Sequence, residues 1–347
     1  MSYESESVLP AGASAQAVRE FVALLGYEKS GVLKFESTRF EQFNWFDTTA
    51  YRSWCGVELS MHLDGQGHVV VHTRTPIARS YYDLIHQNRT ISDLQRRFGG
   101  RFRTDEGPRR YLKPDTGPPT AAASGCHLAF ERFGMNLIKA STCHQAREFP
   151  HQPMQTAKAL KNFEFLLEID PRVLANNTLV PFLVAAVEDY FKSTFVALLR
   201  YSAKKASFLK GVRLQGDQLL AIADGKNTVE EQVAETLPFQ RPAVVCRHFA
   251  GLDPGLDLAS ALRKPYHRRA QSLFDSIDSL ILARHDLIHR ATLDRTMLDD
   301  KVDVIIHDLD AAITRVYRRI TEHYGWVFDR GWWIGRGRRR ARVPPTG

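Results

Sequence analysis

The residues best suited to chemistry lie together near the end of an apolar segment. Arg284, His285, Asp286 and His289 fall within six consecutive positions. The apolar residues around them recur at helical spacing, at Leu273, Phe274, Ile277, Leu280, Ile281 and Ile288. This spacing predicts an amphipathic helix with one face in a core. Because a histidine can move a proton near neutral pH and an arginine can hold a phosphate through two hydrogen bonds, the segment is suited to chemistry at a phosphate.

The spacing of Arg284 and His289 limits what one helix can do. Residues five positions apart on an ideal helix are separated by about 140° around its axis. The two side chains therefore flank a face instead of sharing one, and a single helix would not bring both to one phosphate. Two copies related by a two-fold axis would bring both pairs into one cleft. The alternative is a helix whose charged residues face solvent and have no catalytic role.

The six residues from Arg284 to His289 resemble the Arg-x-x-x-x-His signature of HEPN domains. They share the polar residue directly after the arginine and the apolar pair before the final histidine. HEPN domains are all-α and often dimeric, and many are metal-independent endoribonucleases. The resemblance covers residues 154–325, about half of the chain.

The resemblance implies a role for each residue. His289 would be the acid/base and Arg284 the phosphate clamp, with His285 at the phosphate and Asp286 orienting a neighbour. The ribose 2′-hydroxyl would attack its own phosphate, leaving a 2′,3′-cyclic phosphate and a 5′-hydroxyl. Such domains often belong to toxin or antiviral defence systems, so RNA, a second copy and an antitoxin or sensor are the expected partners. No cofactor is expected.

A second stretch, residues 182–191, resembles the early helix of the family, which packs beside the signature helix. It carries the acids Glu188 and Asp189 among small and apolar residues. Glu188 is expected to hold Arg284 or His289 by a charge-assisted hydrogen bond. The alternative is that both acids lie on a solvent-exposed helix surface. A further alternative for the whole domain is a non-catalytic module that binds nucleotide, nucleic acid or a protein. The presence of both Arg284 and His289 favours the enzyme.

Metal chemistry is a competing hypothesis for the same segment. His285 and His289 are four residues apart on one helix face and Asp286 is close, a spacing that suits a transition metal. No glutamate directly follows His285, and no third ligand is evident. We therefore favour a site without metal over a metal-dependent hydrolase.

The pairs Cys126-His127 and Cys143-His144 form another candidate metal site. A hairpin turning near Gly134 would place the two cysteines opposite each other, where four such ligands could bind zinc. Neighbouring residues of a strand point to opposite faces, however, so each pair would diverge. The sequence favours buried or incidental cysteines.

Composition bounds the class of protein. The 347 residues suffice for two domains, and no apolar run approaches a membrane span. The start of the chain lacks the basic and apolar parts of a secretory signal. Four cysteines indicate a reducing compartment, so a soluble cytoplasmic protein is expected.

The basic residues are clustered. The formal net charge is +8, which suits a polyanionic partner. One cluster comprises Arg96, Arg97, Arg101, Arg103, Arg109 and Arg110, and another Arg336, Arg338, Arg339, Arg340 and Arg342. Arg290, Arg338, Arg339 and Arg340 are the predicted RNA contacts.

The order of patterns predicts an α+β N-terminal domain, residues 14–150, followed by an all-α HEPN-like helical bundle, residues 154–325. Residues 1–13 are expected to be disordered, and residues 326–347 to form a basic, aromatic tail. The N-terminal domain should contain helices at 15–25 and 81–98, strands at 39–46, 55–63 and 69–75, a loop at 101–119 and a hairpin at 127–142. A proline-containing boundary at 149–153 should precede helices at 154–169, 179–209, 266–291 and 296–324, with two short helices within 229–249.

Overall fold

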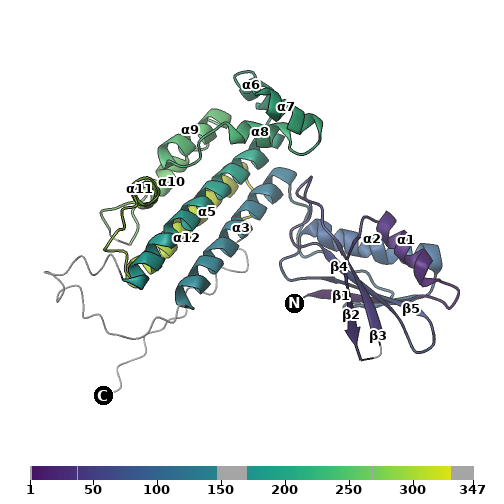
Figure 1. The fold of residues 1–347 in the computed structure, drawn as a ribbon. Helices are drawn as coiled ribbons and strands as arrows, with labels where there is room; N and C mark the ends of the chain where they lie inside the picture. Colours follow the sequence, from purple (N-terminus) through teal and green to yellow (C-terminus); the bar gives the residue numbers. More distant parts are fainter. Residues whose placement is uncertain (1, 37, 147–169, 268, 330–347) are drawn as a thin grey trace, which may run out of the picture. The chain divides into compact units, whose positions relative to one another are not determined.

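The computed structural model describes the chain except for residues 1, 37, 147–169, 268 and 330–347. The chain divides into two compact units, Met1–Ser124 and Gly125–Gly347. The first is an α+β unit and the second is helical (Figure 1). The predicted order of an α+β region followed by an all-α region is thereby confirmed. The predicted boundary at 149–153 and the predicted helix at 154–169 lie outside the described residues.

The N-terminal unit is built on a seven-stranded antiparallel sheet. Its order is β2-β3-β4-β5-β1-β6-β7. The strands are β1 Tyr3–Val8, β2 Glu28–Phe35, β3 Thr38–Trp45, β4 Val57–Leu63, β5 Val69–Thr75, β6 Arg101–Thr104 and β7 Gly107–Pro108. The strands predicted at 39–46, 55–63 and 69–75 correspond to β3, β4 and β5. Burial alternates along β3 and β4, whereas Val69, Val70 and Val71 of β5 are all buried.

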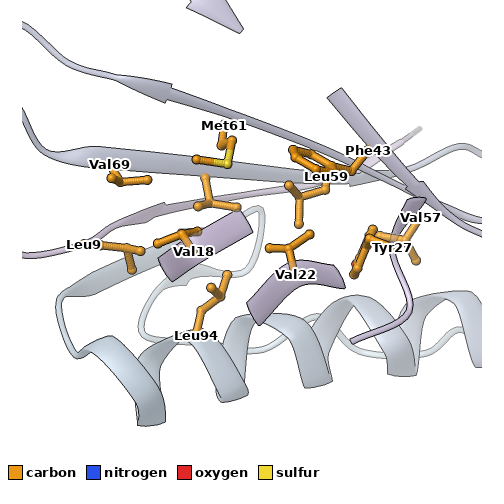
Figure 2. Packing of buried hydrophobic residues seen from close by; sticks show 11 residues of the cluster. Leu9, Val18, Val22, Tyr27, Phe43, Val57, Leu59, Met61, Val69 and Leu94 are labelled. Atoms are coloured by element: carbon orange, nitrogen blue, oxygen red, sulfur yellow. The ribbon is translucent and has the colours of Figure 1, made fainter. Parts of the chain in front are cut away.

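Two helices cover one face of this sheet, α1 (Ala15–Leu24) and α2 (Tyr81–Phe98) (Figure 1). The core lies between them and the strands, and Figure 2 shows its buried side chains. It comprises Leu9, Val18, Val22, Tyr27, Phe43, Val57, Leu59, Met61, Val69, Val71 and Leu94. Both helices were predicted from local signals. Ser14 caps α1, and α2 ends at Gly99, whose φ of 76° suits a residue without a side chain.

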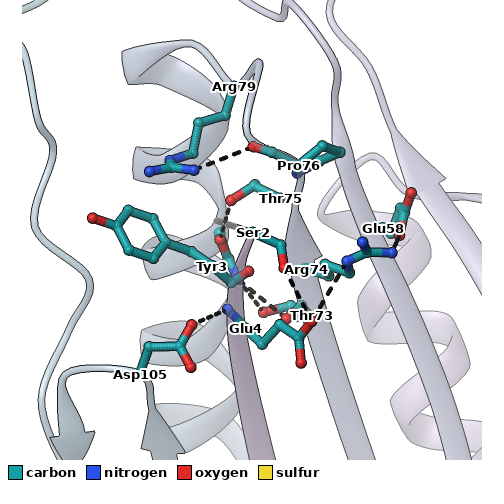
Figure 3. Close-up of polar contacts among 11 residues, drawn as sticks. Ser2, Tyr3, Glu4, Glu58, Thr73, Arg74, Thr75, Pro76, Arg79 and Asp105 are labelled. Carbon is teal, nitrogen blue, oxygen red and sulfur yellow. Dashed lines mark hydrogen bonds and ion pairs between the residues drawn. The ribbon is translucent and has the colours of Figure 1, made fainter.

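The expected disorder of residues 1–13 is wrong, because β1 lies between β5 and β6 in the sheet. Its backbone is paired on both sides, and the Glu4 amide also donates to Asp105 at 2.7 Å (Figure 3). Across the neighbouring strands, Arg74 lies 3.5 Å from Glu4 and 3.4 Å from Glu58. A strand whose buried positions hold serine instead of an apolar residue has no hydrophobic pattern to reveal it.

The hairpin predicted at 127–142 is also wrong, because these residues belong to one helix, α3 (Ala121–Gln145). Its buried apolar residues recur every three or four positions, at Cys126, Ala129, Phe130, Phe133, Leu137 and Ala140. Gly134 suggested a turn, but it lies buried inside the helix. The predicted loop at 101–119 was wrong in part, since β6 and β7 lie within it.

The helical unit is organised around α5 (Pro171–Tyr201), which packs against α8, α9, α11 and α12. Most of α5 is buried, as its central place requires. The other helices are α6 Lys205–Leu209, α7 Gly216–Ala223, α8 Val229–Glu235, α9 Pro242–Leu252, α10 Leu258–Arg263, α11 Leu273–Arg290 and α12 Asp299–Tyr324. The helix predicted at 179–209 begins earlier, because Asp170 caps it and Pro171 occupies its first turn. No helix among the described residues is long and apolar enough to cross a membrane.

Candidate functional site

The signature residues occupy the last turns of α11. The helix begins with a capping box in which Ser272 and Asp275 satisfy each other's backbone amides. Its buried face comprises Leu273, Phe274, Ile277, Leu280 and Ile281, as the sequence predicted. Ile288, assigned to the same face, is 50% exposed. The helix therefore leaves the core before its final turn, and the signature residues lie where burial decreases.

Contacts from two neighbouring helices hold the two ends of α11. At its start, buried Asp308 of α12 accepts hydrogen bonds from Arg269 at 2.6 Å and Ser276 at 2.9 Å. After its end, Asn177 of α5 accepts from the Asp294 amide at 2.9 Å and donates to the Asp294 carbonyl at 3.0 Å. These paired bonds fix the loop that follows the signature.

Asn176 reinforces this connection. Its side-chain amide donates to the Met297 carbonyl at 3.0 Å and to Asp299 at 2.9 Å. Sequence reasoning missed both asparagines and Asp308. A usable signal was present, because asparagine is unfavourable inside a helix and two adjacent ones suggest side chains with partners elsewhere.

The structure brings Arg284 close to Glu188. Arg284 is half-buried on α11 and Glu188 half-buried on α5. Burial raises the pKa of the Glu188 carboxyl, and the nearby Arg284 guanidinium partly offsets this rise. The predicted hydrogen bond is not among those of the described residues, and the Glu188 Oε1 atom is buried without a partner there. Arg284 and Glu188 are therefore coupled by charge, with hydrogen-bonding capacity left over.

The neighbouring acid has a different partner. Asp189 accepts a hydrogen bond from Arg132 of α3 at 2.7 Å, and Arg132 also donates to Ser193. The acid pair of α5 thus serves two helices, with Asp189 tying α3 to α5 and Glu188 facing Arg284 of α11. The sequence alternative of surface acids fits Asp189, whose side chain is 43% exposed, better than Glu188, whose Oε1 atom is buried.

The two histidines of the signature lie side by side on the surface. The ring centroids of His285 and His289 are 4.6 Å apart, and both residues are exposed. No hydrogen bond or ion pair joins Arg284 to His289 in the described part of the chain. This separation agrees with the angle expected between residues five positions apart on a helix. The imidazoles are open to solvent, while the arginine is drawn towards α5.

Asp286 and Arg290 form a surface ion pair. The Arg290 Nη1 atom lies 3.2 Å from Asp286 Oδ1, and both side chains are largely exposed. Such a pair four residues apart contributes only about 0.3–0.5 kcal/mol. Arg290 is therefore only weakly held and can exchange this carboxylate for a phosphate at little cost.

The structure gives no support to either metal hypothesis. The residues with assigned positions contain no group of three or more histidine, cysteine or acidic side chains that could hold a metal ion. Cys126 and Cys143 lie on one helix, seventeen residues and thus about 26 Å apart. They cannot share one ion.

Each histidine of the two pairs has another neighbour. His127 is buried beside the Tyr317 hydroxyl at 3.2 Å, and His144 lies 3.7 Å from Asp303. Both contacts connect α3 with α12. These histidines therefore contribute to packing between α3 and α12.

The basic tail lies largely beyond the described residues. Arg338, Arg339 and Arg340 fall outside them, as does the rest of the second arginine cluster. Within the described part, Trp326 stacks on Tyr324 with ring centroids 4.7 Å apart. The proposed contacts of the tail with RNA therefore rest on the sequence alone.

Comparison with known proteins does not assign a family. No protein-family model, no curated protein and no solved structure matches this chain. The function must be argued from the site itself.

Proposed function

We propose that the helical unit is a HEPN-like, metal-independent endoribonuclease that acts as a homodimer. The observation that carries the proposal is the placement of groups on α11. Exposed His289 lies beside His285, with ring centroids 4.6 Å apart, and half-buried Arg284 lies near the Glu188 carboxylate. A proton carrier open to solvent and a half-buried cation are the two groups that cleavage by a ribose 2′-hydroxyl requires.

The reaction needs no nucleophile from the protein. His289 accepts the proton of the 2′-hydroxyl as its oxygen attacks the adjacent phosphorus. The bond to the 5′-oxygen breaks, and that oxygen takes the proton back from the protonated imidazole of His289. Arg284 neutralises the negative charge that develops on the phosphate. The products are a 2′,3′-cyclic phosphate and a 5′-hydroxyl.

The dimer is part of the proposal because one chain leaves Arg284 and His289 apart. A face with two arginines and two histidines repels itself, so apolar neighbours must drive association. Leu282 and Ile288 of α11 are 48% and 50% exposed, and Phe182 of α5 is 39% exposed. We propose these exposed side chains and half-buried Leu287 as candidate contacts with the second copy.

The decisive experiment mixes two inactive variants. Arg284→Ala and His289→Ala homodimers should each fail to cleave RNA. After mixing and subunit exchange, heterodimers would contain one intact arginine and one intact histidine in the same cleft, and partial activity should return. Sedimentation across the same concentrations measures the dimer. Full specific activity from a strictly monomeric protein would refute the shared site.

The arginine-rich segments are proposed to bind the RNA backbone. Neutralised phosphates release counterions, so affinity should fall steeply with salt. Deleting residues 335–347, which include Arg338, Arg339 and Arg340, should flatten the plot of log affinity against log salt concentration. An unchanged slope would show that this segment does not contact RNA.

A non-catalytic module that binds nucleic acid or a protein is the second candidate. It is favoured by the lack of a hydrogen bond or ion pair between Arg284 and His289 in the described part of one chain. Expression of the wild type and His289→Ala side by side separates the two functions. Equal growth and intact cellular RNA in both cases, with RNA still bound by the purified protein, would favour the binding module. A toxin or defence role would follow only from cleavage that arrests growth.

A further inference from the structure

The N-terminal unit contains a pocket that the RNA-cleavage proposal does not use. It lies where β3 ends, between the end of α1 and the middle of α2, and has a volume of about 370 Å³. This lies within the size range of small-molecule sites. Its lining includes Leu25, Trp45, Phe46, Arg52, His86 and Arg89, together with Asp47, Thr48 and Thr49. A ligand there would meet aromatic side chains, two arginines and the Asp47 carboxylate within a largely polar lining.

The aromatic wall is held in place by stacking. The Trp45 and His86 rings are 3.8 Å apart between centroids and inclined by only 10°. Tyr27, which is buried, contacts the same imidazole at 5.3 Å. Phe46 is 49% exposed beside them. The fold therefore prepares a rigid aromatic surface with one ring open to solvent.

This wall carries hydrogen-bonding groups without protein partners. The His86 Nε2 atom is buried and unpartnered among the described residues. The Trp45 indole N–H likewise donates to no residue with an assigned position. Burial lowers the pKa of His86 to about 4, so its imidazole is neutral at physiological pH. A neutral imidazole and an indole N–H can contact the heteroatoms of a polar ring.

The pocket lining contains two arginines, Arg52 and Arg89, but one acidic residue, Asp47. Asp47 lies 2.7 Å from Arg52, while its other oxygen accepts the amides of Thr49 and Ala50 at 3.1 and 3.2 Å. Arg89 makes one ion pair among the described residues, to Asp93 at 3.4 Å on the exposed surface. In the described part of the chain, Arg89 is thus held only by an exposed ion pair. Arg52 is paired with Asp47, which also accepts hydrogen bonds from two loop amides. Guanidinium groups bind phosphate through paired hydrogen bonds.

We infer that this pocket binds a nucleotide, with the base against Phe46 and Trp45 and the phosphate between Arg52 and Arg89. The same chemistry fits a free nucleoside monophosphate and one nucleotide of an RNA strand. The inference goes beyond the cleavage proposal and does not rest on it, because every residue involved lies in the N-terminal unit.

Calorimetric titration of the full-length protein tests the inference, with AMP, adenosine and inorganic phosphate as probes. AMP should bind saturably, and adenosine and phosphate should each bind at least about tenfold more weakly, because each lacks half of the contacts. Arg52→Gln and Arg89→Gln should each weaken AMP binding by about tenfold. Arg39→Gln is the matched control, since Arg39 is an exposed arginine of the same unit outside the pocket. Its AMP affinity should equal that of the wild type.

A single-stranded oligoribonucleotide with a blocked 5′ end distinguishes the two sources of the nucleotide. If Arg89→Gln weakens the binding of AMP but not that of the oligonucleotide, the ligand is a free nucleotide. If Arg89→Gln weakens the binding of the oligonucleotide but not that of AMP, the ligand is an RNA strand. The inference is overturned if neither probe loses affinity in Arg52→Gln and Arg89→Gln, or if phosphate alone binds as tightly as AMP. Arg52 and Arg89 belong to the N-terminal unit and not to α11, so this outcome is separate from the fate of the cleavage proposal. Melting temperatures of all variants verify the fold.

Discussion

Helices α2 and α11 begin alike and serve different purposes. Each has 18 residues and starts with the same capping box, Ser80 with Asp83 and Ser272 with Asp275. Asp83 is fully buried and also accepts the amides of Trp54 and Cys55 at 3.0 and 3.2 Å, whereas Asp275 remains exposed. In the N-terminal unit the capping box therefore also ties the loop at Trp54 and Cys55 to α2. In the helical unit it only caps α11.

Other polar residues of the two helices differ in the same way, apart from His86 and Arg89 of α2, which line the N-terminal pocket. Buried Gln87 of α2 donates to the Tyr3 and Thr73 carbonyls at 3.2 and 3.1 Å, and it accepts from Thr75 at 2.9 Å. On α11, His285 and His289 are exposed and Arg284 has no hydrogen bond among the described residues. Satisfied polar groups in α2 stabilise the fold, while the unused groups of α11 are available for a ligand.

The largest expected effect is on catalysis. Arg284→Ala and His289→Ala should each lower RNA cleavage on the order of a thousandfold, because one removes the phosphate clamp and the other the proton carrier. Both residues lie away from the core, so circular dichroism and melting temperature should change little. His307→Ala, an exposed histidine of α12, is the control and should cleave normally. Substantial activity in either variant would remove the assignment.

The next effect is on stability and compares the two capping boxes directly. Asp83→Ala should destabilise the N-terminal unit by about 3 kcal/mol or more, because it leaves buried amides without an acceptor. Asp275→Ala removes only a cap and should cost about 1 kcal/mol. Urea denaturation of the full chain measures both. Similar losses for the two variants would contradict the distinction between the helices.

A smaller effect is expected where α5 holds the loop after α11. Asn177→Ala should destabilise the helical unit by about 2 kcal/mol, since it leaves the Asp294 amide and carbonyl without partners. Thr178→Ala is the control, because Thr178 is exposed and bonds only within its own helix. If cleavage depends on a fixed loop, Asn177→Ala should also lower its rate while RNA affinity persists. Equal stability of the two variants would show that the asparagine bonds do not hold the loop.

The smallest effect concerns Glu188 and pH. Its pKa is raised in the folded protein, so the folded state binds more protons than the unfolded state between the ordinary value of 4.5 and the raised one. The stability that the protonated carboxyl contributes is present below that window and is lost as pH rises through it. Glu188→Gln should remove this dependence and stabilise the protein by about 0.5 kcal/mol at neutral pH.

Arg284→Gln provides the matching measurement. The guanidinium opposes the rise in the Glu188 pKa, so its removal should extend the loss of stability to higher pH. Denaturation at a series of pH values detects both shifts. A stability profile that neither variant changes would show that Glu188 and Arg284 are not coupled.

The sequence by itself determined the elements that carry their own boundary signals. Helices α1, α2 and α12 start or end where capping residues and glycines predict, and β3 and β4 follow from alternation. The placement of Arg284 and His289 on one helix, and their divergence around it, also followed from spacing alone. These features depend on residues close together in the chain, so local physics decides them.

Only the tertiary structure decided which segments meet. The polar strand β1 is ordered because β5 and β6 supply backbone partners on both sides, and nothing within residues 3–8 reveals them. α3 is helical because its apolar face is buried, although Gly134 locally favours a turn. Likewise, the separate partners of Glu188 and Asp189 depend on where α3 and α11 pack against α5. In each case the stabilising contact joins residues far apart in sequence, and a pattern read along the chain cannot contain it.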